Sequence, residues 1–197
     1  MRMRDWSDWF TTFNGVVYLA VLGLPLAFML VALLAWRRRA AGVSTGWAWR
    51  RSLAEVGMVY GTVPWVWLTV LPGSHAGQVP GRVSLVPFRD LLDMGTLGIV
   101  GNLLVLAALG FFAPIRFLAL ASLPRVLTLG AACSILIETS QYVFRLDRVS
   151  SIDDVLVNTA GAGLAALLSR PWWRRSVSGC SEPGAEEAAG GDLVRAR

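Results

Sequence analysis

One segment of the chain combines apolar residues with an acid, an amide and an arginine that could take part in chemistry. Ser134, Glu138, Gln141 and Arg145 recur at spacings of four, three and four residues, which stacks them on one face of a helix. An ionisable group inside such an apolar segment is costly to bury and is a functional candidate by default. A carboxylate there could bind a ligand, titrate, or hold a divalent metal together with other oxygens. Glu138 is therefore the first candidate site residue.

A second polar group opens the next apolar segment. Asp154 and Asn158 are four residues apart and share a helical face. Asp153 also fits a structural role, because acids favour the N-cap and first turn of a helix. Asn158 fits hydrogen bonding between helices as well as it fits ligand binding. Glu138 in turn fits a helix–helix hydrogen bond with Asn102 or Asn158, so structural and functional interpretations both stay open.

The composition places these residues in a membrane protein. The chain of 197 residues is 55% hydrophobic and 16% charged, with a mean hydropathy of +0.56, whereas soluble domains carry about 25% charged residues. The net charge of +5 does not indicate nucleic-acid binding, because most arginines flank apolar segments, as membrane topology requires. His75 is the only histidine, which argues against a histidine-rich metal site and a Ser-His-Asp triad. We expect no cofactor and no resident metal.

Five apolar segments are long enough to cross the hydrocarbon core of a bilayer, ~30 Å thick, as helices. They are residues 16–36, 53–71, 97–113, 126–144 and 152–168. We therefore predict an all-α fold, a polytopic integral membrane bundle of about five transmembrane helices. The chain divides into residues 1–52 (an extra N-terminal transmembrane helix and a basic cytoplasmic loop), 53–170 (a helical domain) and 171–197 (a disordered cytoplasmic tail rich in Gly, Ala, Ser and Glu).

The arginines predict the orientation of this bundle. One side carries the larger set: Arg37, Arg38, Arg39, Arg50, Arg51, Arg116, Arg125, Arg170, Arg174 and Arg175. The other side carries a smaller set of arginines: Arg2, Arg4, Arg82, Arg89, Arg145 and Arg148. Five aspartates lie beside this smaller set. Because the arginine-rich side of a membrane protein faces the cytoplasm, we place the N-terminus outside and the C-terminus in the cytoplasm.

This orientation brings polar residues of three helices to a similar depth near the outer surface. Glu138 lies ~9 Å and Asn102 ~7.5 Å below the outer ends of their helices, and Asn158 lies about one turn below Asp154. The loop 72–96 lies on the same side, where Arg89 could reach Glu138 and Asp154. An arginine there would lower the cost of buried carboxylates and present a fork for a phosphate or carboxylate group.

At these residues the chain resembles the VanZ-like family of membrane proteins, named for a glycopeptide-resistance protein of Gram-positive bacteria. The matching motifs cover roughly residues 56–168: Ser84-Leu85-Val86-Pro87-Phe88-Arg89, Gly101-Asn102-Leu103-Leu104, Ser134-Ile135-Leu136-Ile137-Glu138 with Gln141, and Asp153-Asp154-Val155-Leu156-Val157-Asn158. Either Arg145 or Arg148 takes the family's arginine position. Family members usually show Phe-Xaa-Pro-Xaa-Gly where this chain has residues 106–110, Leu-Ala-Ala-Leu-Gly. The first helix lies outside the match.

The resemblance implies a multi-pass protein of the bacterial cytoplasmic membrane. It also implies a link, in some members, to reduced susceptibility to glycopeptides of the teicoplanin type. It supplies no catalytic mechanism.

Three functions fit the polar residues. The favoured one is a membrane protein that binds a lipid or a lipid-linked cell-envelope precursor by its headgroup. The residues expected at that site are Arg89, Asn102, Glu138, Gln141, Arg145, Asp153, Asp154 and Asn158. The second is a metal-dependent enzyme acting on phosphorylated lipids, with Asp153, Asp154 and Glu138 as oxygen ligands of Mg²⁺. The third is a small proton-coupled transporter in which Glu138 titrates. If the protein is catalytic, Glu138 and Asp154 are the best candidates.

Overall fold

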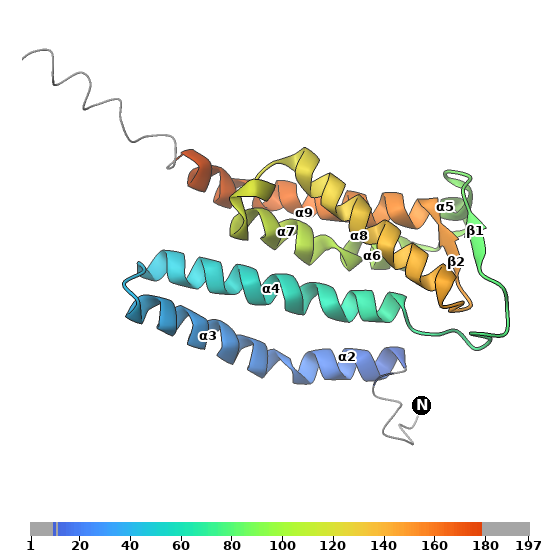
Figure 1. Cartoon of the computed structure of the whole chain (residues 1–197), viewed down its shortest axis with the longest axis horizontal. Coiled ribbons are helices and arrows are strands. Elements are labelled where there is room, and N and C mark those ends of the chain that lie inside the picture. Colours follow the sequence, from blue (N-terminus) through green and yellow to red (C-terminus); the bar gives the residue numbers. More distant parts are fainter. Residues whose placement is uncertain (1–9, 11, 179–197) are drawn as a thin grey trace, which may run out of the picture.

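The computed structural model describes residue 10 and residues 12–178, which form a bundle of long helices with a small β ribbon at one end (Figure 1). The helices are α2 (Phe13–Leu22), α3 (Leu24–Ala40), α4 (Thr45–Thr69), α5 (Arg89–Asp93), α6 (Thr96–Val105), α7 (Ala107–Arg116), α8 (Leu123–Val143) and α9 (Ile152–Ser178). The ribbon pairs β1 (Arg82–Ser84) with β2 (Val149–Ser151), and η1 (Leu118–Leu120) is one turn of 3-10 helix. The predicted all-α membrane fold is confirmed.

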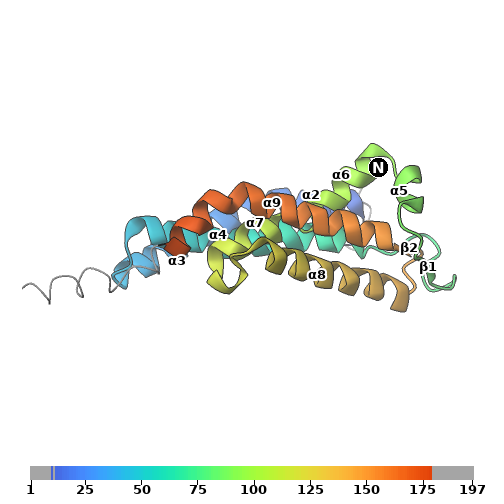
Figure 2. The same ribbon diagram turned by 90° about the horizontal axis from the view of Figure 1, so that it is seen from above.

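Four helical stretches in the described part of the chain are long and apolar enough to cross a membrane. They are Phe13–Ala40, Thr96–Arg116, Leu123–Val143 and Ile152–Trp173. The second predicted span corresponds to α4, whose 25 residues form a rod about 37 Å long. Glu55 and several aromatic residues make α4 less apolar than the other four stretches, although it lies between α3 and α7 (Figures 1 and 2). The crossing of the membrane by α4, and the orientation of the bundle, stay predictions.

Two of the predicted helices are interrupted. α2 and α3 meet at Gly23, and the first turn of α3 contains a proline, a position at which the missing N–H breaks no helical hydrogen bond. α6 and α7 meet at Leu106, whose backbone (φ −113°, ψ 8°) leaves the helical conformation. Each pair still forms one continuous membrane-length stretch.

The core lies where α9 contacts α6, α7 and α8. Its buried apolar side chains are Val105, Leu106, Val126, Ile137, Ala162 and Ala166. Glycines allow the backbones to approach closely: a Cβ atom on Gly161 would clash with the backbone oxygen of Leu103, and one on Gly110 would clash with that of Ala162. Close approach at small residues is the usual way in which helices associate in lipid.

α9 is longer than the sequence predicted. Trp173 is buried and its Nε1 donates to the backbone oxygen of Ala166 (3.3 Å), while Trp172 packs against Phe111 with ring centroids 5.8 Å apart. The first contact lies within α9, and the second joins α9 to α7 beyond Pro171. Residues 171–178 of the predicted disordered tail are therefore helical, and residues 179–197 lie outside the described residues.

Candidate functional site at the ribbon end

The β ribbon gathers three distant segments at one end of the bundle. β1 pairs in parallel with β2 from Arg82 opposite Val149 to Ser84 opposite Ser151. β1 belongs to the long loop after α4, and β2 leads directly into α9. The pairing therefore brings this loop and α5 to the ends of α8 and α9, the end that we call the ribbon end (Figures 1 and 2).

Glu138 is buried beneath this ribbon. Its side chain is 8% exposed, and its Oε2 accepts a hydrogen bond from the backbone N–H of Ser151 (3.0 Å). The hydroxyl of Ser150 donates to the backbone oxygen of Glu138 (2.8 Å). The carboxylate is thus bound by β2, and the hydrogen bond with Asn102 or Asn158 that the sequence suggested does not form.

Asp153 holds the loop in place. It is 1% exposed; its Oδ1 accepts from the backbone N–H of Phe88 (2.7 Å), and its Oδ2 accepts from those of Asp90 and Leu91 (3.0 Å each). Phe88 has a left-handed backbone (φ 66°), which turns the chain so that these amides face the carboxylate. These contacts give Asp153 a structural role, but with amides at the start of α5 and not with the first turn of its own helix, which the sequence suggested.

The two asparagines connect helices in a pattern that differs from the predicted one. Nδ2 of Asn102 donates to Oδ1 of Asp154 (2.5 Å), joining α6 to α9. Nδ2 of Asn158 donates to the hydroxyl of Ser134 (2.9 Å), joining α9 to α8. Asn158 is 1% exposed, and its Oδ1 has no hydrogen-bond partner among the described residues.

Of the three remaining predicted site residues, Gln141 bonds to another helix, whereas Arg89 and Arg145 do not bond to Glu138 or Asp154. Gln141 is buried and donates to the backbone oxygen of Thr69 (3.0 Å), at the end of α4. Arg145 lies beyond the end of α8 with a left-handed backbone (φ 50°), and its side chain is exposed. Arg89 is exposed too, and its side chain forms no hydrogen bond or ion pair with any described residue. The expectation that Arg89 reaches Glu138 and Asp154 is therefore wrong.

Arg148 is the arginine whose charge acts on both of the carboxylates Glu138 and Asp154. Its Nε donates to the backbone oxygen of Leu71 (3.3 Å), at the end of α4. Of the two positions that the sequence left open, Arg148 rather than Arg145 fits a site arginine. Helical spacing could not distinguish them, because the chain leaves the helix at Phe144.

Asp90 also belongs to the site and was not predicted. The hydroxyl of Ser151 donates to its Oδ2 (2.6 Å). Hydrogen bonds from Ser151 and then Ser84 lower the pKa of the Asp90 carboxyl, and the nearby charge of Arg89 adds to this effect. Asp90 directly follows Arg89, the last residue of the loop motif. Its place beside that motif was visible in the sequence, but nothing there indicated its hydrogen bond with Ser151.

An open apolar groove of about 380 Å³ lies beside Glu138. The apolar part of its lining comes from β1 and its flank, α8 and the first turn of α9: Val83, Leu85, Ile135, Tyr142, Ile152 and Val155. Glu138, Thr139, Ser150 and Ser151 supply the polar part. The groove therefore offers an apolar surface with a buried acid, Glu138, among its lining residues.

The carboxylates do not assemble into the metal site of the second hypothesis. Both oxygens of Asp153 accept backbone N–H groups, and Asp154 is hydrogen-bonded to Asn102. Within the described residues there is no group of three or more His, Cys, Asp or Glu side chains that could hold a metal ion. Asp153, Asp154 and Glu138 therefore do not form a shared ligand set.

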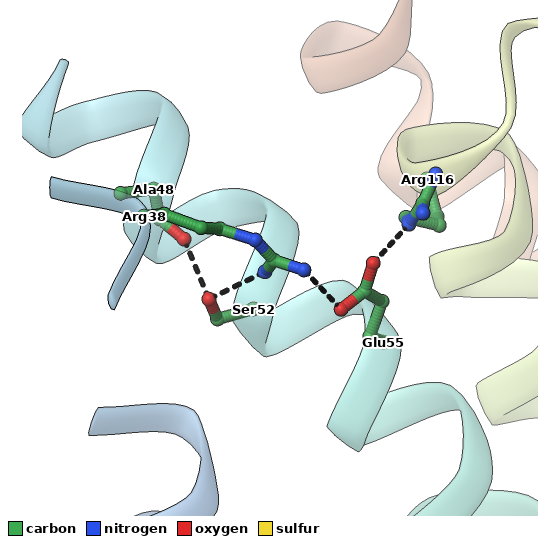
Figure 3. Close-up of polar contacts among 5 residues, drawn as sticks. All are labelled: Arg38, Ala48, Ser52, Glu55 and Arg116. Carbon is green, nitrogen blue, oxygen red and sulfur yellow. Dashed lines mark hydrogen bonds and ion pairs between the residues drawn. The ribbon is translucent and has the colours of Figure 1, made fainter. Parts of the chain in front are cut away.

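A second polar cluster, for which the sequence suggested no role, lies at the opposite end of the bundle. Glu55 of α4 pairs with Arg38 of α3 and with Arg116 of α7, and Arg38 also donates to the hydroxyl of Ser52 (2.6 Å) (Figure 3). The signal that could have found it is a single acid in an apolar segment whose neighbouring turns are rich in arginine. This cluster joins three helices.

The fold and the polar site define a multi-pass membrane protein, a helical bundle with buried carboxylates at its ribbon end. The VanZ/LLP1 family model matches residues 58–174, from the middle of α4 into the last turns of α9. The chain therefore belongs to the VanZ/LLP1 family, and the predicted resemblance is confirmed. Comparisons with curated proteins and with solved structures found no match.

Proposed function

We propose that this protein binds a lipid, or a lipid-linked cell-envelope precursor, at the outer leaflet of the bacterial cytoplasmic membrane. The observation that carries the proposal is the apolar groove that the buried acid Glu138 helps to line. Such a surface matches an amphiphile, with its chain along the groove and its headgroup at the ribbon. We propose the buried polar residues at the ribbon end as the headgroup site, with Arg148 in place of Arg89 and Arg145.

The two parts of the site would contribute differently to binding. Each methylene that moves from water to the groove contributes about 0.8 kcal/mol, although a chain that arrives from the bilayer gains much less. Selectivity must therefore come from the headgroup. Glu138 can accept hydrogen bonds from a hydroxyl or amine group, and the charge of Arg148 can attract a phosphate. A headgroup carrying both kinds of group, such as a glycosylated or amine-bearing phosphate ester, fits this pair best.

A groove-filling variant tests where the chain binds. Ile135 lines the groove, whereas its neighbour Leu136 does not and is 66% exposed. We expect Ile135→Trp to lower the retention of a polyprenyl phosphate on the detergent-purified protein, because the larger side chain fills space that the lipid chain would occupy. The matched control, Leu136→Trp, adds the same side chain outside the groove and should retain the wild-type level. Equal retention by both variants would refute binding in the groove.

Substitutions at the charged residues test the headgroup and separate the alternatives. Arg148→Gln removes the charge that attracts a phosphate, so we expect a folded protein that no longer discriminates between polyprenyl phosphate and the corresponding alcohol. Turnover of the phosphate that is lost in Asp154→Asn would favour the enzyme instead. Proton flux in proteoliposomes that is lost in Glu138→Gln would favour the transporter.

The family resemblance extends the proposal to glycopeptide resistance. If the bound lipid is an envelope precursor, expression of the protein should raise the inhibitory concentration of teicoplanin for a susceptible Gram-positive host. Expression of Glu138→Gln at the same level should not. The same inhibitory concentration with both proteins would separate resistance from this site.

A further inference from the structure

The end of the bundle opposite the ribbon carries an excess of positive charge. Glu55 is the only carboxylate that the described residues place there, and its two oxygens are already shared by Arg38 and Arg116 (Figure 3). The side chains of Arg50 and Arg51, one turn before Glu55 on α4, form no hydrogen bond or ion pair with any described residue. Among the described residues, their positive charge therefore has no counter-charge.

These arginines surround a cavity. A hollow of about 160 Å³ is lined by Arg50, Arg51 and Arg116, by Trp47 and Trp172, and by Ile115 and Leu118. Its walls come from α4, α7, η1 and α9. Three arginines at one hollow whose lining contains no acid favour an anion, because like charges that converge repel one another until a counter-charge arrives.

The geometry of Arg116 prepares it for such a ligand. Glu55 binds its Nε, and the guanidinium lies over the ring of Phe117, 4.8 Å from the centroid. Neither terminal Nη group of Arg116 donates to a described residue. The guanidinium is thus fixed in orientation while its two outer donors stay available, and such a planar pair of donors matches a phosphate group.

We propose that this cavity binds the phosphate group of an anionic phospholipid headgroup, at the leaflet opposite the ribbon site. Tryptophan is enriched in membrane proteins at the depth of the lipid headgroups. Basic pockets between membrane helices at the cytoplasmic surface bind anionic headgroups. The size of the hollow suits a phosphate and its neighbouring glycerol carbons. The site shares no residue with the ribbon end, so it stands independently of the function proposed above.

Removal of two charges from the cavity, compared with removal of two charges beside it, tests the proposal. Arg50→Gln/Arg51→Gln takes charges from the hollow, and Arg37→Gln/Arg39→Gln takes two exposed charges from the end of α3, outside the hollow. The full-length protein in a neutral detergent is titrated with phosphatidylglycerol and with phosphatidylcholine, and bound lipid is counted by native mass spectrometry. Glycerol 3-phosphate is added in a parallel arm.

We expect the wild type to prefer phosphatidylglycerol, and we expect Arg50→Gln/Arg51→Gln to bind it ~10- to 30-fold more weakly. The Arg37→Gln/Arg39→Gln control should bind as the wild type does. Displacement of the lipid by glycerol 3-phosphate would support a site for the phosphate group itself, and failure to displace it would support a site for the whole lipid.

Equal losses in the two double variants, or equal binding of the two lipids by the wild type, would overturn the proposal. If the double variant does not fold, Arg51→Gln alone, at an exposed position, should weaken binding ~5-fold. Unchanged binding by that variant would equally overturn it.

Discussion

Replacement of Asp153 should release the loop that covers the polar site while the bundle stays folded. In Asp153→Ala the backbone N–H groups of Phe88, Asp90 and Leu91 lose their common acceptor. Nothing else described in the structure accepts hydrogen bonds from these three groups at the start of α5. The helices pack without them, because the core residues lie elsewhere in α6–α9.

The magnitude follows from the kind of hydrogen bond. Hydrogen bonds to a charged group contribute about 1.5–3 kcal/mol each, but the released amides lie near the surface and regain water. We therefore expect the free energy of local opening to fall by roughly 2–3 kcal/mol, the equivalent of one such bond. That corresponds to ~30- to 150-fold faster hydrogen exchange at the three amides.

Hydrogen–deuterium exchange with peptide resolution measures this effect directly. Peptides covering residues 86–93 should exchange faster in Asp153→Ala, and peptides from α8 should not change. Asp154→Asn is the matched control, because Asp154 bonds to Asn102 and not to the loop. If exchange of the loop is the same in wild type and Asp153→Ala, the assignment of Asp153 as the anchor of the loop is wrong.

Three further predictions concern stability and pH. Glu55→Gln should lower the unfolding free energy in detergent by about 1–3 kcal/mol, less than for a fully buried pair because the side chain is 25% exposed; an unchanged melting temperature would show that the arginines need no counter-charge. Gly161→Ala should destabilise the folded protein by about 2 kcal/mol or more, since the new Cβ would meet the backbone oxygen of Leu103. Its control, Gly101→Ala on α6, places a Cβ where nothing lies within 4 Å and should be neutral or stabilising. Similar melting temperatures for the two variants would contradict the close packing of α6 and α9. The lowered pKa of Asp90 means that its contact with Ser151 stabilises the folded loop above the unfolded-state pKa, about 4, and is lost only as the pH falls through the lower folded value. Hydrogen exchange of residues 86–93 should therefore stay constant from pH 7 to about 4, after correction for the intrinsic rate. In Ser151→Ala, the loss of protection should begin at a higher pH. If it begins at the same pH in both proteins, the hydrogen bond from Ser151 is not the cause of the lowered pKa of Asp90.

The parts of the site that lie on helices could be predicted from the sequence. Ser134, Glu138 and Gln141 are all buried on one face of α8, because the geometry of a helix is set locally and spacing is enough to place its side chains. Asp154 and Asn158 likewise lie on α9 at contacts with other helices.

The rest could not be predicted because it depends on backbone outside the helices. Arg89 follows the left-handed residue Phe88, and Arg145 is itself left-handed, so no periodic pattern places either side chain. The partners of Glu138 and Asp153 are backbone N–H groups of β2 and of the loop, groups that every residue carries and that no side-chain pattern reveals. Glu55 was overlooked for a different reason: its partners come from two other helices, far away in the sequence.

The parallel pairing of β1 with β2 has a consequence for how the protein is made. β1 leaves the ribosome before α6, α7 and α8, whereas its partner follows all three. Throughout that interval of synthesis the loop lacks its strand partner, and the amides around Phe88 lack the carboxylate that will bind them. The ribbon end is thus completed only when the final helix enters the bilayer, which makes the insertion of α9 the step that closes the site.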